Sequence, residues 1–192
     1  MRWAGRSGYC PGVGYPTLET ERLALRPLRG DDLADLSRLH AEETFWWYPD
    51  RRGWTESETA AFIERTEQRY VEDGCGVAAV VVRASGDLAG WAGLAVPWFL
   101  PEILPAVEVG WRLGEAFHGL GYATEAGRAW VEYGFEVLGL DEIVSIYEPE
   151  NTSSGAVMAK LGFVLDLETV HPVRSHKIHI TKKTRSAHVD GR

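Results

Sequence analysis

The stretch "HGLGYATEA" occupies residues 118–126, between a β-rich segment at 106–113 and an amphipathic segment that continues to residue 137. A glycine-rich turn that leaves a strand and opens a helix presents unpaired backbone N–H groups at the positive end of the helix dipole. Such a turn is an anion site that usually holds phosphate. Gly119 and Gly121 lack the Cβ atoms that would keep a diphosphate away, and Thr124 adds a hydroxyl. The turn therefore predicts a ligand that carries phosphate.

The segment after the turn has one apolar face at helical spacing. Its apolar positions are Tyr122, Ala126, Ala129, Trp130, Tyr133 and Val137. Charged side chains fall on the other side, at Glu125, Arg128, Glu132 and Glu136. We expect one face of this helix to pack on a sheet and the other to meet water.

Two common phosphate loops do not fit the turn. A P-loop needs Lys followed by Ser or Thr after its second glycine, and neither is present. The dinucleotide fingerprint needs a third Gly or Ala where this sequence has Thr124.

The other segments alternate between strand and helix patterns, with no repeat or linker. We expect strands at 22–29, in a hairpin over 76–96, at 106–113, from 141 to a stop at Pro149, at 163–170 and at 175–183. Further helices are expected at 30–43 with Asp31 or Asp32 as N-cap, at 55–74 with a Thr55–Glu58 capping box and a stop at Gly74, and at 152–162. This order predicts a mixed α/β domain with a mainly antiparallel sheet.

Length and charge restrict the class of protein. A chain of 192 residues fits one domain, and no apolar run approaches the roughly 20 residues that span a bilayer. The net charge is −8, and residues 174–192 hold six Lys or Arg and one acid. The acidic remainder favours an amine partner and disfavours nucleic acid.

The ends and the cysteines suggest where the protein works. Residues 1–16 contain Arg2 and Arg6 but no apolar run of a secretory signal, so we expect a flexible leader. We place the folded domain at 17–182 and a flexible basic tail at 183–192. Cys10 and Cys75 alone cannot build a disulfide framework, which favours a cytoplasmic protein.

Two stretches together resemble one family. The turn is similar to the diphosphate loop of the GNAT superfamily of acyl-CoA N-acyltransferases, Gln/Arg-x-x-Gly-x-Gly/Ala, with His118 in place of Gln or Arg. The stretch "NTSSGAVMAKLGF" (151–163) resembles the later Asn-x-x-Ser and Lys-x-Gly-Phe of that superfamily. Together with "LETERLALRPL" (18–28) and "EVGWRLGEAF" (108–117), the pattern resembles the RimJ/RimL-like branch of ribosomal-protein alanine N-acetyltransferases.

The resemblance implies a fold and a set of ligand contacts. It implies about seven strands and about four helices, with a splayed central strand pair that holds acyl-CoA and opens near Gly114. It implies acetyl-CoA as acyl donor and no metal, and it leaves a homodimer open. The implied donor-binding residues are Trp111 and Leu113 by their backbone, then His118, Gly119, Leu120, Gly121, Tyr122, Ala123 and Thr124, with Asn151 and Ser154. Asn151 is equally suited to cap its helix.

Glu108 is the candidate base. An amine attacks a thioester only as the free base, yet an α-amine titrates near ~7.7–8.0 and a lysine near ~10.4. Glu108 alternates with Val107 and Val109, so its side chain faces opposite to theirs. A strand glutamate usually faces solvent. In the family that this sequence resembles, a glutamate at this place accepts the proton through a water.

The leaving thiolate needs a hydrogen-bond donor. Many relatives use a tyrosine two residues before the Lys of Lys-x-Gly-Phe, but this position is Met158. In the branch resembled here the serine of Asn-x-x-Ser takes the role, so Ser154 is the first candidate and Tyr147 the second. Ser154 would also serve as an ordinary first-turn serine.

The stretch "ETFWWYPDRRGW" (43–54) is expected to be an aromatic loop. Trp46, Trp47 and Tyr48 would either wall a pocket for the amine, with Glu42 or Glu43 nearby, or plug the sheet. Metal binding is not expected, because His176 and His179 would lie on opposite faces of one strand, with His171 apart from both.

The sequence therefore predicts an acetyl-CoA-dependent N-acetyltransferase that acts on a protein N-terminus or a small amine. Two alternatives remain: an acyl-CoA-binding sensor without turnover, and a partner-binding module that uses the aromatic loop and the basic tail.

Overall fold

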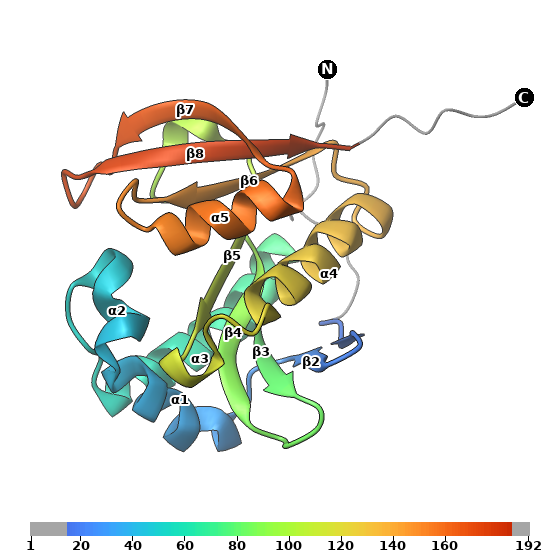
Figure 1. Cartoon of the computed structure of the whole chain (residues 1–192), viewed down its shortest axis with the longest axis vertical. Coiled ribbons are helices and arrows are strands. Elements are labelled where there is room, and N and C mark those ends of the chain that lie inside the picture. Colours follow the sequence, from blue (N-terminus) through green and yellow to red (C-terminus); the bar gives the residue numbers. More distant parts are fainter. Residues whose placement is uncertain (1–14, 186–192) are drawn as a thin grey trace, which may run out of the picture.

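Eight strands form one twisted sheet in the computed structural model, which describes residues 15–185 (Figure 1). Most of the predicted leader and tail lies outside this range. The strand order is β1-β2-β3-β4-β5-β6-β8-β7, and only β5 and β6 run parallel. The strands are β1 (Leu18–Glu19), β2 (Leu23–Arg26), β3 (Val77–Val82), β4 (Leu88–Ala95), β5 (Glu108–Leu113), β6 (Glu142–Tyr147), β7 (Val164–Val170) and β8 (Lys177–Thr184). The predicted mixed, mainly antiparallel α/β fold is confirmed.

Five α-helices cover the two faces of this sheet. They are α1 (Leu33–Ala41), α2 (Glu43–Asp50), α3 (Glu56–Asp73), α4 (Tyr122–Glu136) and α5 (Thr152–Leu161). Helices α4 and α5 lie on one face, and α1 to α3 lie on the other (Figure 1). Alternation along β3 separates the two layers, because Ala78 and Val80 join the core under α4 while Ala79 joins the core under α1.

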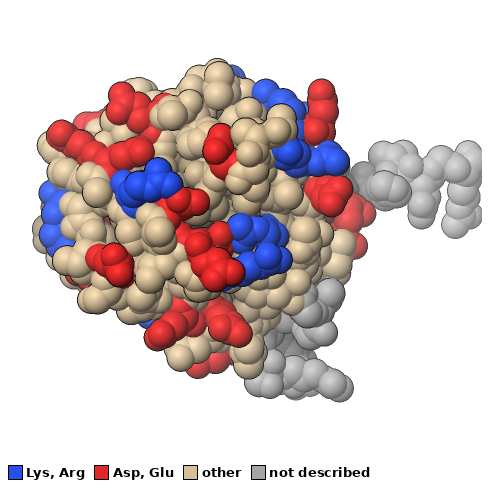
Figure 2. Space-filling view, turned by 90° about the horizontal axis from the view of Figure 1, so that it is seen from below, with Lys and Arg blue, Asp and Glu red and all other residues tan. Residues whose placement is uncertain are grey.

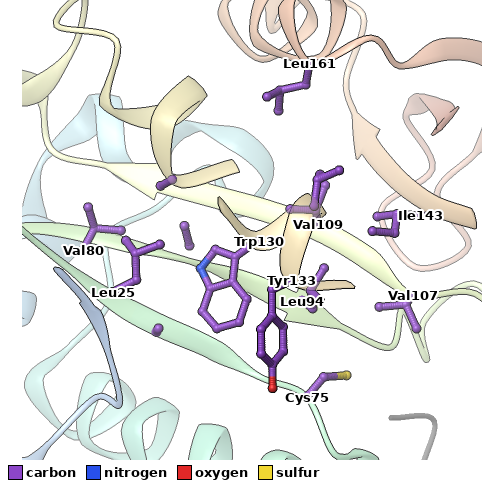
Figure 3. Packing of buried hydrophobic residues seen from close by; sticks show 14 of the residues in the cluster. Leu25, Cys75, Val80, Leu94, Val107, Val109, Trp130, Tyr133, Ile143 and Leu161 are labelled. Atoms are coloured by element: carbon purple, nitrogen blue, oxygen red, sulfur yellow. The ribbon is translucent and has the colours of Figure 1, made fainter. Parts of the chain in front are cut away.

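The main core lies between α4 and the centre of the sheet. Trp130 of α4 is 1% exposed and lies with Tyr133 over the strands that carry Leu25, Val80 and Leu94 (Figure 3). Burying a large aromatic side chain removes most of its apolar surface from water and stabilises the fold. This packing holds α4 against β4 and β5 and fixes the position of its first turn.

Helix ends follow the predicted signals. The Thr55 hydroxyl accepts from the Glu58 N–H at the start of α3, and Gly74 ends that helix in the left-handed conformation. Of the two aspartates proposed at the start of α1, Asp32 is the N-cap residue. Its carboxylate accepts from the Arg29 N–H and pairs with Arg26 rather than capping the helix.

The parallel pair β5 and β6 diverges shortly after it begins. The Val144 N–H donates to the Val107 carbonyl at 2.9 Å, and the Ser145 hydroxyl donates to the Val109 carbonyl at 2.8 Å. Beyond this point β6 continues beside β8, with which it pairs over its whole length. We call the wedge between β5 and β6 the splay.

The splay opens earlier than predicted. The predicted position near Gly114 was wrong, because β5 pairs with β6 only at Glu108, six positions earlier, while the Gly114 N–H is bonded to Ala89 of β4. Glycine is required there for another reason: an added Cβ would lie 2.5 Å from Leu39 of α1. Strand β6 stays paired with β8 along its whole length, whereas its pairing with β5 is confined to Val144 opposite Glu108.

Two other expectations need correction. The predicted loop over 43–54 contains a helix, α2, because the Phe45 and Trp46 N–H groups bond to the Glu42 carbonyl and begin a helical turn. This helix is kinked at Tyr48, the residue before a proline, where helical backbone is disfavoured. With α2 and the short β1, the counts are five helices and eight strands instead of about four and about seven. Across the part of the chain that the structure describes, no helix is both long and apolar enough to cross a membrane.

Candidate active site

The turn at 118–121 forms an exposed cradle at the start of α4. Gly119 has φ +72° and Gly121, the N-cap residue, has φ +83°, a backbone conformation that glycine adopts without strain. No atom comes within 4 Å of a Cβ built on Gly119, so this side of the turn is open. The N–H groups of the first helical turn have no partner within the helix, which makes the cradle fit for a diphosphate.

The His118 side chain is hydrogen-bonded to the end of β5, just before the cradle. Its Nε2 lies 2.8 Å from the Leu113 carbonyl, so this nitrogen carries the proton and donates it. The histidine thus shapes the turn through a bond to the backbone.

The backbone of β5 faces the splay at alternate residues. The carbonyls of Val107 and Val109 point toward β6, so the polar groups of Trp111 and Leu113 point the same way. Because β6 has diverged there, these groups border the wedge, although His118 already occupies the Leu113 carbonyl. The Trp111 indole packs on α4, where an added Cβ at Gly127 would lie 3.4 Å from it.

Glu108 lies at the narrow end of the splay, on the face opposite to α4. It is partly buried, and burial raises the pKa of its carboxyl to about 8. A hydrogen bond from the Ile146 backbone N–H opposes this rise. The same bond places the carboxyl between β5 and β6, so the residue is not the solvent-facing strand glutamate that the sequence alone would favour.

Tyr147 and the first turn of α5 lie together on the other face. An added Cβ at Gly155 would lie 3.0 Å from the Tyr147 ring, so the ring packs directly beneath this turn. Asn151 caps the helix, because its Oδ1 accepts from the Ser154 N–H at 3.2 Å. The capping role left open for Asn151 is therefore present, and its amide N–H groups remain as donors for a ligand.

The Tyr147 hydroxyl is directed away from β5. It lies 3.2 Å from Nδ1 of His179 on β8. His179 in turn places Nε2 at 3.4 Å from the Glu168 carboxylate on β7. Tyr147 and Ser154 are the two candidates for the hydrogen-bond donor to the thiolate. Of these, Tyr147 is the one whose hydroxyl contacts a residue of the outer strands.

Ion pairs hold the end of α2 across the open end of the splay. Asp50 accepts from Arg112 of β5 at 2.9 Å and from Arg174 of the β7–β8 turn at 2.8 Å. Arg51 pairs with Glu148, which follows β6 and is 4% exposed. Helix α2 is therefore tied to both strands of the wedge. Sequence reasoning missed this cluster, although Arg112 lies four residues after Glu108 and so faces the same side of β5.

The aromatic residues proposed for the acceptor lie in this region and contact protein groups. The Arg51 guanidinium sits over the rings of Trp47 and Tyr48, at 5.1 Å and 4.6 Å from their centres. The Trp46 indole donates to the Ala41 carbonyl. Glu42 accepts from the Glu115 N–H at 2.9 Å and thereby connects the start of α2 to the segment before the cradle.

On the face of the molecule seen from below, Lys and Arg side chains lie among Asp and Glu side chains, so this face is not uniformly basic (Figure 2). Within residues 15–185, no three His, Cys, Asp or Glu side chains gather as metal ligands would.

Comparison with known proteins gives consistent matches. The sequence matches the model of the acetyltransferase (GNAT) domain over residues 22–164. It is 28% identical to the uncharacterized N-acetyltransferase p20 of Bacillus licheniformis, over 77% of this chain and 82% of that protein. It is also 28% identical to spermidine N(1)-acetyltransferase of Escherichia coli K12, over 77% of this chain and 75% of that protein. A solved acetyltransferase from Agrobacterium tumefaciens C58, 28% identical, has a TM-score of 0.74 and covers 94% of this chain and 100% of its own.

Proposed function

Because the chain belongs to the GNAT acetyltransferase family, we propose that it transfers an acetyl group from acetyl-CoA to a primary amine within one ternary complex. The observation that carries this proposal is the splay, because the Trp111 backbone lies beyond the point where β5 and β6 stop pairing and the cradle follows β5 at the start of α4. Acetyl-CoA supplies the thioester that the amine attacks. The residues of this chain bind it, take up the proton and stabilise the thiolate.

Different donor-binding residues would bind different parts of acetyl-CoA. N–H groups at Gly121, Tyr122, Ala123 and Thr124 would receive the diphosphate, because they lie at the positive end of α4. The backbone of Trp111 and the N–H of Leu113 would pair with the pantetheine amides as a missing strand would. Asn151 would add an amide N–H from the α5 side.

The proposed catalytic residues come from opposite faces of the sheet, which would suit a direct attack. Glu108 faces the side of α2, so we assign the amine to that side and the proton to this carboxylate, directly or through a water. Tyr147 packs beneath the first turn of α5 and Ser154 belongs to that turn, so the sulfur would leave toward them. The amine and the leaving group therefore need not occupy the same space.

The acceptor is a primary amine of one of two kinds. The RimJ/RimL-like motifs support the α-amine of a protein N-terminus, and the spermidine acetyltransferase among the relatives supports a small amine. The pKa of about 8 for Glu108 lies close to that of an α-amine, ~7.7–8.0, and well below that of a lysine-type amine, ~10.4. Proton transfer to this carboxylate would be nearly balanced from an α-ammonium group and uphill by about two pK units from a lysine-type ammonium, which favours the α-amine.

The test is thiol release from acetyl-CoA with a panel of amines and of short peptides with free N-termini, together with calorimetric titration of acetyl-CoA. Turnover that depends on an amine is expected. Tight binding without turnover across the panel would favour the acyl-CoA sensor. Failure to bind acetyl-CoA would overturn the proposal.

A further inference from the structure

Arg22 lies near the start of the sequence, and its side chain contacts the cradle before α4. It directly precedes β2, about one hundred positions before the glycine turn. Its Nη1 donates to the Leu120 carbonyl at 2.9 Å. Its guanidinium centre lies 4.8 Å from the centre of the Tyr122 ring. One arginine therefore contacts residues on both sides of Gly121.

Glu125 holds this arginine in place. Its carboxylate accepts from Nε of Arg22 at 2.6 Å and from the Arg22 backbone N–H at 2.9 Å. The Thr20 hydroxyl donates to the same carboxylate at 2.6 Å. Each of these bonds involves an ionised carboxylate, and such bonds are stronger than neutral ones. The guanidinium therefore has little freedom to leave the turn.

We propose that Arg22 is a positioning residue for the diphosphate of acetyl-CoA; this inference rests on the proposed function. The peptide between Leu120 and Gly121 is planar and trans, so its carbonyl and its N–H point in opposite directions. Arg22 holds that carbonyl on its own side of the turn. The Gly121 N–H is thereby directed to the other side, where the phosphate oxygens bind.

Arg22 also neutralises the negative charge that Glu125 adds to the first turn of α4. Glu125 places a carboxylate there, and an uncompensated carboxylate would repel a diphosphate bound at the same helix end. The Arg22–Glu125 pair is neutral overall. The partial positive charge of the helix N-terminus therefore remains available to the ligand.

The glycine at 121 belongs to the same arrangement. A Cβ there would lie 3.3 Å from Nη2 of Arg22, and φ is +83°. The turn therefore accommodates the guanidinium and the left-handed backbone at the same residue.

The experiment compares two acyl donors in steady-state kinetics of Arg22→Met. Acetyl-CoA carries the diphosphate, whereas S-acetylpantetheine ends before it and still offers the thioester and both amides. We expect KM for acetyl-CoA to rise about tenfold, the effect of losing one charge-assisted interaction, with kcat changed less than about threefold. We expect kcat/KM for S-acetylpantetheine to be unchanged.

Arg52→Met is the matched control. Arg52 pairs with Glu58 in the first turn of α3 at 2.6 Å, so it repeats the arginine–glutamate pair on a helix away from the cradle. Both donors should behave as in the wild type. Arg22→Lys keeps the charge and the fold but loses the planar fork, and it should show the same donor-selective loss in weaker form. This variant carries the test if Arg22→Met does not fold.

Two results would overturn the role of Arg22 while leaving the proposed function intact. One is an equal loss with both donors, which would make the arginine a residue of the fold only. The other is an unchanged KM for acetyl-CoA in both Arg22→Met and Arg22→Lys. If the wild type itself neither binds nor uses acetyl-CoA, the proposed function fails and the role of Arg22 fails with it.

Discussion

The hydroxyl of Tyr147 lies 3.2 Å from Nδ1 of His179, so the phenol is bonded toward the outer strands of the sheet. Ser154 lies above the same strand end, in the first turn of α5, and its backbone is held by the Asn151 cap. The sequence ranks Ser154 before Tyr147 as the hydrogen-bond donor to the leaving thiolate, and the structure gives the two side chains different surroundings. They make different predictions for the step in which the thiolate leaves.

Ser154→Ala should reduce kcat by about 10²-fold, because a hydrogen-bond donor to the developing charge is lost. KM for acetyl-CoA should change little. Tyr147→Phe should stay within about threefold of the wild type, since its hydroxyl serves His179. The measurement is steady-state kinetics with one amine acceptor. Ser153→Ala, an exposed serine in the same turn, is the control. A larger loss in Tyr147→Phe than in Ser154→Ala would reverse the assignment.

The activity of the wild type should rise with pH through about 8, because Glu108 accepts a proton only after it has lost its own. In Glu108→Gln, kcat should fall at least about 10²-fold, and the part of the pH profile that belongs to this carboxyl should disappear. Profiles between pH 6 and 9 with one α-amine acceptor measure this, and any rise left in the variant belongs to the amine. Equal profiles in the two proteins would exclude Glu108 as the base.

The stability of the two proteins should also differ with pH. The pKa of Glu108 is raised in the folded state, so the folded protein keeps a proton that the unfolded chain loses above about 4.3. The contribution of Glu108 to stability should therefore decline as the pH rises from about 4.5 through 8, so the stability of the wild type relative to Glu108→Gln should be lower at pH 8 than at pH 5. Urea unfolding at pH 5 and 8 tests the sign.

Local signals were sufficient for the elements that surround the proposed donor site. The apolar spacing around Trp130 and the glycine turn predicted α4 and its exposed start, and Asn151 and Gly162 marked the ends of α5. The Thr55–Glu58 pair likewise marked the start of α3. Each of these features depends on residues within a few positions of one another, which is why the sequence reveals them.

Features set by distant contacts could not be predicted. Where β5 and β6 separate, β6 stays paired with β8, whose paired residues lie 32 to 42 positions later in the sequence. The pairing of Asp50 with Arg174 joins residues 124 positions apart. None of these contacts leaves a periodic pattern in the sequence.

Asp50→Asn should destabilise the protein by about 2–3 kcal/mol, because it leaves the mostly buried Arg112 beside Arg174 without their shared carboxylate. Burial already lowers the pKa of Arg112, and Asp50 opposes that shift. Urea unfolding at pH 7 measures the loss. Asp35→Asn, which breaks an exposed ion pair with Arg38, is the control and should cost less than about 1 kcal/mol. Similar losses in the two variants would show that the cluster at α2 contributes no more than a surface pair.

His40 predicts how the fold responds to acid. It is fully buried beside Trp54, and its Nδ1 lies 2.9 Å from the Thr59 hydroxyl. That hydroxyl donates to the Thr55 carbonyl, so Nδ1 carries a proton, and the buried Nε2 has no hydrogen-bond partner within residues 15–185, as suits a neutral ring. Burial, reinforced by the charge of Arg112, lowers the pKa of His40 to about 4. The unfolded chain takes up a proton near 6.5, and the folded protein does not.

The contribution of His40 to wild-type stability should therefore fall by about 1.4 kcal/mol for each pH unit below 6.5, until the pH approaches 4. In His40→Gln, which keeps an N–H donor for Thr59, this contribution should vanish, although the variant is less stable at pH 7 because it loses ring packing. Urea unfolding at pH 7, 6 and 5 gives the slopes. Leu39→Ala, a core variant that retains His40, should be destabilised at every pH and keep the wild-type slope. If His40→Gln keeps that slope as well, the acid sensitivity of this fold arises from other groups.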